Sequence, residues 1–154
     1  MGFRLLYGVH MRILVPTDFS DHATAAVRYA APLAKRFGAE VVLVHATATR
    51  PPFVPLPGSG GVFIPTYEEN DRFAYAALER ARSAHLGGVK AHTRLAFGKP
   101  ADAILQAAHA SAADMIVMAT RGRRGLARVV LGSVAEAVVR RSELPVLTVK
   151  QEAV

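Results

Sequence analysis

The stretch that decides the fold is Glu40-Val41-Val42-Leu43-Val44-His45-Ala46, a run of mostly apolar and β-branched residues. Such a run is typical of a strand that is covered on both faces, as strands are in parallel sheets. Residues 12–16 form a similar run. Between the two runs, residues 21–37 carry apolar residues at helical spacing and are followed by Gly38, a natural helix stop. The chain therefore opens with a strand, a helix and a parallel strand, which form a right-handed crossover unit.

The same alternation continues along the chain. The pattern predicts helices that begin after Thr66, at Pro100 and at Ser133, and strands over 89–97, 114–119 and 145–149. Five strands alternating with four helices indicate an α/β domain, an open doubly wound parallel sheet with helices on both faces.

Length and composition indicate a single domain. The chain has 154 residues, of which 51% are hydrophobic and 20% charged, so we expect one well-filled core. We divide it into an N-terminal extension (1–10), the domain (11–150) and a short tail (151–154). Residues 47–65 are rich in proline and glycine, which predicts a long mobile loop.

Several classes of protein are excluded or disfavoured. The chain has no cysteine, so disulfides and thiolate nucleophiles are excluded. No run approaches the roughly 18 consecutive apolar residues of a membrane span, and we expect a cytoplasmic protein without membrane contact. The net charge of +7 favours anionic partners, although such a charge also serves solubility alone.

Two stretches fall where ligands bind in open parallel sheets, beyond the C-terminal ends of the strands at the point where the strand order reverses. One is Asp18, just after the first strand, and the other surrounds Gly122, Gly132 and Ser133. A glycine lets backbone approach a ligand closely, and a helix N-terminus favours a phosphate. Each has a plainer reading: Asp18 as a turn residue, and Ser133 as the first residue of a capping box with Glu136.

These residues stand in motifs that resemble those of the universal stress protein family. The resemblance covers residues 11–150 and rests on Ile13-Leu14-Val15-Pro16-Thr17-Asp18-Phe19-Ser20 and on Met118-Ala119-Thr120-Arg121-Gly122, followed after nine residues by Gly132-Ser133-Val134-Ala135-Glu136. It implies a strand order of 3-2-1-4-5, ATP or another adenine nucleotide as ligand, with Mg²⁺ held through the phosphates, and a homodimer through Val146–Val149.

The resemblance also implies roles for single residues. Asp18 would lie at the ribose, the backbone of Ala46 at the adenine, and Met118 and Ala119 on the ribose side, while Gly122, Gly132, Ser133 and Val134 would hold phosphates. We expect the complete ligand-binding set to be Pro16, Thr17, Asp18, Ala46, Met118, Ala119, Arg121, Gly122, Arg123, Gly132, Ser133 and Val134. We assign no metal ligand to a protein side chain.

The chain departs from the family pattern at two of these positions. Ala119 stands where the first motif glycine is expected, and its methyl group could crowd the ribose or the phosphates. Arg121 stands where histidine is usual, and it could neutralise phosphate charge or point into solvent.

No motif for efficient chemistry accompanies the binding motifs. Gly98-Lys99 is followed by proline, so a phosphate loop is absent, and no serine-hydrolase elbow occurs. No general base is placed for attack of water on a phosphate. We therefore expect an ATP-binding stress-response or regulatory protein with slow or no hydrolysis. The alternative is a nucleotide-independent dimeric interaction protein, and nucleic-acid binding ranks behind both.

Overall fold

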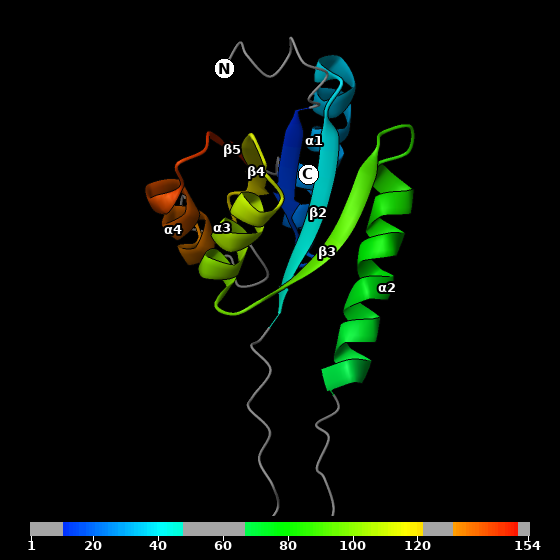
Figure 1. The fold of residues 1–154 in the computed structure, drawn as a ribbon, viewed down its shortest axis with the longest axis vertical. Coiled ribbons are helices and arrows are strands. Elements are labelled where there is room, and N and C mark those ends of the chain that lie inside the picture. The colour runs from blue at the N-terminus through cyan, green and yellow to red at the C-terminus, as the bar shows by residue number, and fades with distance from the viewer. Residues whose placement is uncertain (1–10, 48–66, 122–130, 151–154) are drawn as a thin grey trace, which may run out of the picture.

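The computed structural model describes residues 11–47, 67–121 and 131–150, and within them the protein forms one five-stranded parallel sheet (Figure 1). The order β3-β2-β1-β4-β5 confirms the expected topology. The strands are β1 (Arg12–Pro16), β2 (Glu40–Thr47), β3 (Ala91–Phe97), β4 (Met115–Ala119) and β5 (Val146–Val149). The helices are α1 (Asp21–Phe37), α2 (Tyr67–His85), α3 (Pro100–Ala110) and α4 (Ser133–Arg141).

The central strands are buried on both faces, as their continuous apolar sequence predicts. In β1, Ile13, Leu14 and Val15 are fully buried, and in β2 every residue from Glu40 to Val44 is buried. Helices α1 and α2 cover one face of the sheet, and α3 and α4 cover the other (Figure 1). Two hydrophobic cores result, one on each side of β1, β2 and β4.

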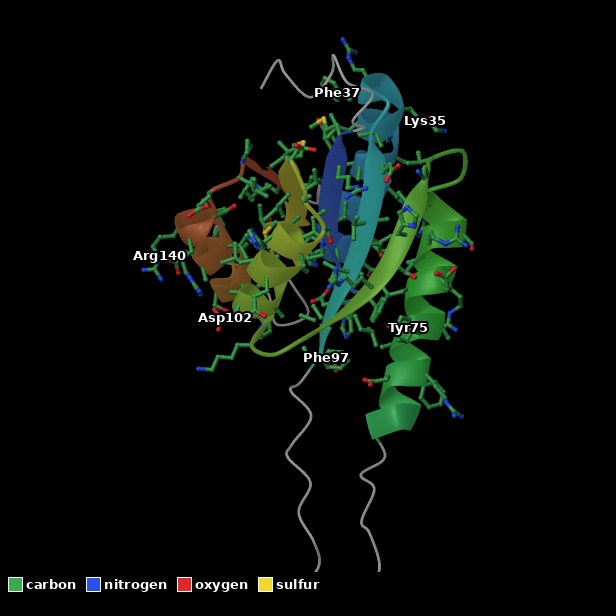
Figure 2. The ribbon with its side chains drawn as sticks, viewed as in Figure 1. Lys35, Phe37, Tyr75, Phe97, Asp102 and Arg140 are labelled. Carbon is green, nitrogen blue, oxygen red and sulfur yellow. The ribbon has the colours of Figure 1, made fainter. Side chains whose placement is uncertain are left out.

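Local signals set the ends of the helices. The Ser20 hydroxyl caps α1 by accepting a hydrogen bond from the amide of Ala23, and Gly38 ends it at a φ of 59°, which glycine adopts without strain. Helix α3 begins with Pro100 at its first position. Asp102 of α3 forms an ion pair with Arg141 of α4 at 2.7 Å, and Figure 2 shows Asp102 on the outer surface of this helix pair.

A nearly buried carboxylate stands at the N-terminal edge of the sheet. Glu40, the first residue of β2, accepts hydrogen bonds from Lys90 and from Arg12, the latter at 3.4 Å, and His92 lies 3.8 Å away. The Lys90 hydrogen bond is the main cause that lowers the pKa of Glu40 below 4.5. These contacts join β1, β2 and the start of β3 at the end of the sheet opposite the strand termini that follow Pro16 and Ala119.

Some expectations fall on parts of the chain that are not described. The extension at 1–10, the tail at 151–154 and the loop after Thr47 lie outside the described residues, as do Gly122 and Arg123. Thr47, which we expected to open the loop, is the last residue of β2 and pairs with Phe97.

Candidate nucleotide site

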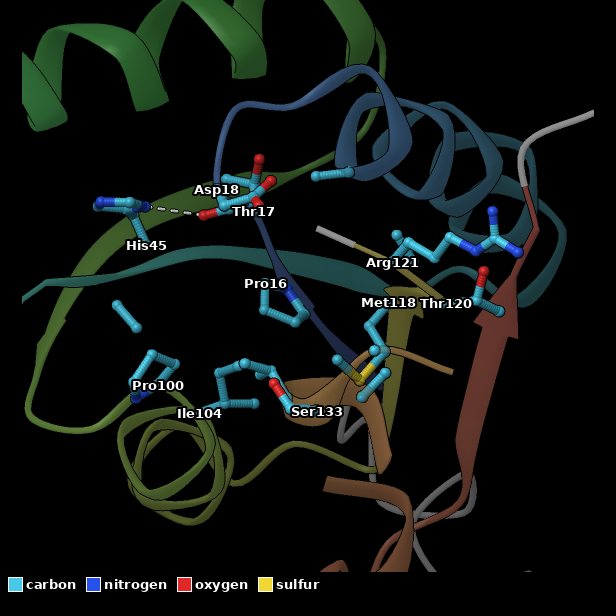
Figure 3. A pocket seen from close by; sticks show the side chains of 16 residues that line it. Pro16, Thr17, Asp18, His45, Pro100, Ile104, Met118, Thr120, Arg121 and Ser133 are labelled. Atoms are coloured by element: carbon cyan, nitrogen blue, oxygen red, sulfur yellow. Dashed lines mark hydrogen bonds between the residues drawn. The ribbon is translucent and has the colours of Figure 1, made fainter. Parts of the chain in front are cut away.

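A cavity of about 490 Å³ lies at the C-terminal ends of β1 and β4, where the strand order reverses (Figure 3). Residues of α3 and α4 line it as well. It is lined by Pro16, Thr17, Asp18, Ala23, His45, Ala46, Pro100, Ile104, Met118, Ala119, Thr120, Arg121, Gly132, Ser133, Val134 and Ala135. Every described residue of the expected ligand-binding set lies in this lining, so the structure brings those residues together from both halves of the chain.

The turn after β1 is fixed by its own hydrogen bonds. The amide of Thr17 donates to the carbonyl of Val44 at 2.8 Å, and the amide of Phe19 donates to Oγ1 of Thr17 at 3.0 Å. Oδ1 of Asp18 accepts from both the amide and the hydroxyl of Ser20, at 3.0 and 2.5 Å. Asp18 is therefore a turn residue, as one reading of its sequence position expected, and it also lines the cavity.

The opposite wall is the start of α4. The amide of Gly132 donates to the carbonyl of Thr120 at 2.7 Å, which ties the helix start to the end of β4. Gly132 is the N-cap residue, and Ser133 occupies the first helical position. The capping-box reading of Ser133 is therefore wrong, because the capping position belongs to a glycine that has no side chain with which to cap. The first amides of α4 receive no side-chain cap from residue 132.

The floor between these polar walls is apolar. Ile104 of α3 and Met118 and Ala119 of β4 are each buried by more than nine-tenths and line the cavity with Ala46 and Pro100. Ligand pockets typically combine an apolar lining with a few converging polar groups, in volumes of roughly 300–1,000 Å³. The cavity has both properties.

Sequence reasoning missed six of the lining residues. They are Ala23, His45, Pro100, Ile104, Thr120 and Ala135. Of these, His45 has its Nδ1 atom 2.8 Å from the carbonyl oxygen of Thr17. Pro100 and Ile104 line the cavity because α3 begins at the sheet edge where β3 ends. The alternation of strands and helices in the sequence could have indicated this.

Among the described residues that line the cavity, the charged side chains are Asp18 and Arg121. Figure 3 shows the Arg121 side chain extending away from Asp18 and Ser133. Among the described residues, no three histidine or acidic side chains gather in a way that could hold a metal ion. In the same residues, no helix is long and apolar enough to cross a membrane.

A profile of the universal stress protein family matches residues 10–150. The chain belongs to the universal stress protein family. A universal stress protein of Methanocaldococcus jannaschii is 38% identical over 93% of this chain and 84% of its own length. One from Thermus aquaticus is 39% identical over 90% of this chain and 97% of its own length.

Solved structures of similar proteins share this fold. A second Methanocaldococcus jannaschii protein has a TM-score of 0.72 at 28% identity and covers 94% of this chain and 99% of its own. A universal stress protein in complex with cAMP has a TM-score of 0.63 at 28% identity, covering 92% and 97%. The Archaeoglobus fulgidus universal stress protein in complex with dAMP has a TM-score of 0.58 at 26% identity, covering 90% and 97%.

Proposed function

We propose that this protein binds an adenine nucleotide, ATP or a shorter relative, in the cavity between β1 and β4, and that it acts as a regulatory stress-response module. One observation carries the proposal: Asp18 and the start of α4 line one cavity whose floor is apolar. Two similar proteins solved in complex with cAMP and dAMP support the choice of adenine nucleotides.

The lining residues suggest which part of the nucleotide each side of the cavity would bind. The apolar floor suits a purine base, and the carboxylate of Asp18 can accept hydrogen bonds from ribose hydroxyl groups. Helix geometry leaves the N–H groups of Ser133, Val134 and Ala135 without intrahelical acceptors, and with the helix dipole they favour a phosphate. Gly132 and the Ser133 hydroxyl stand beside these groups.

Magnesium would enter with the nucleotide rather than through a protein site. Among the described residues no three acidic or histidine side chains gather so as to hold a metal ion. We propose that a bound Mg²⁺ is held mainly by the nucleotide phosphates and by water, since Mg²⁺ usually keeps several waters and binds substrate phosphates. Asp18 is the one carboxylate among the described residues that line the cavity, and its Oδ1 already accepts two hydrogen bonds from Ser20. We therefore propose binding with slow or no hydrolysis.

The test is to identify and then titrate the ligand. Freshly purified protein is examined by native mass spectrometry and, after denaturation, by chromatography of the released small molecules. Nucleotide-free protein is then titrated calorimetrically with ATP, with and without Mg²⁺, and with AMP, adenosine and GTP. Saturable binding of adenine compounds supports the proposal, whereas a folded protein that neither carries nor binds any of them contradicts it.

A second candidate function is dimeric interaction that does not need a nucleotide. Within the described residues, β5 pairs with β4 alone and all four of its residues are partly exposed. The carbonyls of Pro145 and Val149 both accept hydrogen bonds on the β4 side, so the backbone groups of Val146 and Thr148 face the outer edge. We propose that this edge pairs with a second copy of the chain.

A further inference from the structure

Phe19 has a backbone conformation that its side chain disfavours. Its φ is 64°, in the left-handed region, and among the described residues the only other non-glycine residue with a positive φ is Ala112. A bulky residue rarely stays in this region unless its surroundings hold it there. Glycine would adopt the same φ without strain, so the backbone alone gives no reason for phenylalanine at this position.

The ring of Phe19 is held against His45. The two ring centroids are 4.5 Å apart with an angle of 31° between the planes. His45 is itself fixed, since its Nδ1 lies 2.8 Å from the carbonyl oxygen of Thr17. Because a carbonyl oxygen can only accept, Nδ1 carries the proton in this contact, whether the ring is neutral or charged.

These contacts hold the residues before and after Asp18 in place. Thr17 is tied through its amide to Val44 and through its carbonyl to His45, and Phe19 is tied through its amide to Thr17 and through its ring to His45. Asp18 stands between two residues that are anchored to the end of β2. Figure 3 shows Thr17, Asp18 and His45 grouped at one side of the cavity, opposite Ser133.

We propose that Phe19 is a positioning residue for the nucleotide site: by packing on His45 it holds the turn after β1 so that Asp18 is presented to the ligand. The inference rests on the proposed function, since it assigns the presentation of a group in that same site. Phe19 is absent from the cavity lining, and it acts through Asp18 rather than on the ligand.

The test is a double-mutant cycle on the full chain. Phe19→Gly removes the ring and relieves the backbone, Phe19→Tyr keeps a ring, and Asp18→Asn removes the charge of the presented group. Binding of AMP is measured by calorimetry, and thermal unfolding is recorded for each variant. We expect Phe19→Gly to weaken AMP binding about tenfold, Phe19→Tyr to bind within about twofold of the unmodified protein, and Phe19→Gly to add no further loss in the Asp18→Asn background.

The outcomes separate the two proposals. Equal AMP binding by Phe19→Gly and the unmodified protein overturns the positioning role and leaves the proposed function intact. Losses that multiply in the double variant overturn it too, because they show that the ring contributes independently of Asp18. Failure of the unmodified protein to bind any adenine nucleotide overturns both claims.

Discussion

The amide nitrogen of Gly132 lies 2.7 Å from the carbonyl oxygen of Thr120. This hydrogen bond joins the residue that caps α4 to the residue that follows β4, and it fixes the helix start beside the cavity. The amide of Thr120 in turn donates to the carbonyl of Val149 at 3.0 Å, so the same point is tied to β5. The position of the candidate phosphate site is therefore set by the sheet.

Gly132→Ser should raise stability while it weakens phosphate binding. Gly132 has a φ of −70°, which any residue adopts, and serine is a preferred N-cap residue. Its hydroxyl oxygen would accept from the amide of Val134 or Ala135 and so compete with a phosphate. We expect the free energy of unfolding to rise by roughly 0.2–0.5 kcal/mol, and the affinity for AMP to fall about tenfold, as when one charge-assisted hydrogen bond is lost.

Adenosine provides the matched control for this variant. It has no phosphate, so its affinity should be equal in Gly132→Ser and the unmodified protein, as measured by calorimetry. Chemical denaturation reports the stability. Equal loss of AMP and adenosine binding would show that α4 does not hold the phosphate.

Asp18→Asn should weaken the binding of nucleosides more than the binding of the free base. Asparagine keeps an oxygen that can accept from Ser20, so the turn should persist. Loss of the charge should lower affinity for adenosine about tenfold, because hydrogen bonds to a charged group contribute roughly 1.5–3 kcal/mol. Adenine lacks the ribose and should bind both proteins alike. If adenine and adenosine lose affinity equally, Asp18 does not act at the ribose.

The sequence predicts the sheet well because its signals are local. The apolar run of β2, the stop at Gly38 and the start of α4 at Ser133 can each be recognised from neighbouring residues, and the structure confirms them. The residues that follow β1 and β4 line one cavity because the C-terminal ends of parallel strands lie at the same edge of the sheet. His45 could not be assigned to it in this way, because the place of its side chain depends on contacts with Thr17 and Phe19 in the turn after β1.

The helix start shows a subtler limit of sequence reasoning. Ser133 and Glu136 have the spacing of a capping box, yet Gly132 takes the capping position. Its amide is engaged by Thr120, which follows β4 and lies far away in sequence. Such a hydrogen bond depends on the tertiary structure, so the residues around Gly132 in the sequence do not predict it.

Glu40→Gln should destabilise the protein at neutral pH and much less in acid. The pKa of Glu40 is lowered, chiefly by the Lys90 hydrogen bond, so the folded state holds this proton more weakly than the unfolded state. The stabilisation is complete above the ordinary pKa near 4.5 and is lost as the pH falls through the lowered value. We expect a loss of about 1–3 kcal/mol at pH 7.

Urea denaturation of both proteins at pH 7 and at about pH 3 measures this difference. The difference in the free energy of unfolding between the unmodified protein and Glu40→Gln should be smaller at about pH 3 than at pH 7. If this difference in the free energy of unfolding does not change with pH, the charge of Glu40 does not contribute to stability. Nucleotide affinity at pH 7 should be unchanged, because Glu40 lies at the other end of the sheet from the cavity.

Thr148→Pro should disrupt the proposed dimer without disrupting the sheet. The amide of Thr148 faces the outer edge of β5, and proline is tolerated on edge strands where that N–H faces outward. Light scattering coupled to size exclusion should give a dimer for the unmodified protein and a monomer for the variant. A variant that remains dimeric while its thermal unfolding is unchanged would place the interface elsewhere.

The central claim, that Asp18 and the start of α4 form one nucleotide site, is tested most directly by amide chemical shifts in ¹⁵N-labelled protein titrated with AMP. We predict that the amides of Thr17, Asp18, Ser133 and Val134 shift together along one binding curve, while those of Arg12 and Lys90 at the opposite end of the sheet stay in place. Shifts confined to one of the two walls, or found instead at the Glu40 end, would contradict the account.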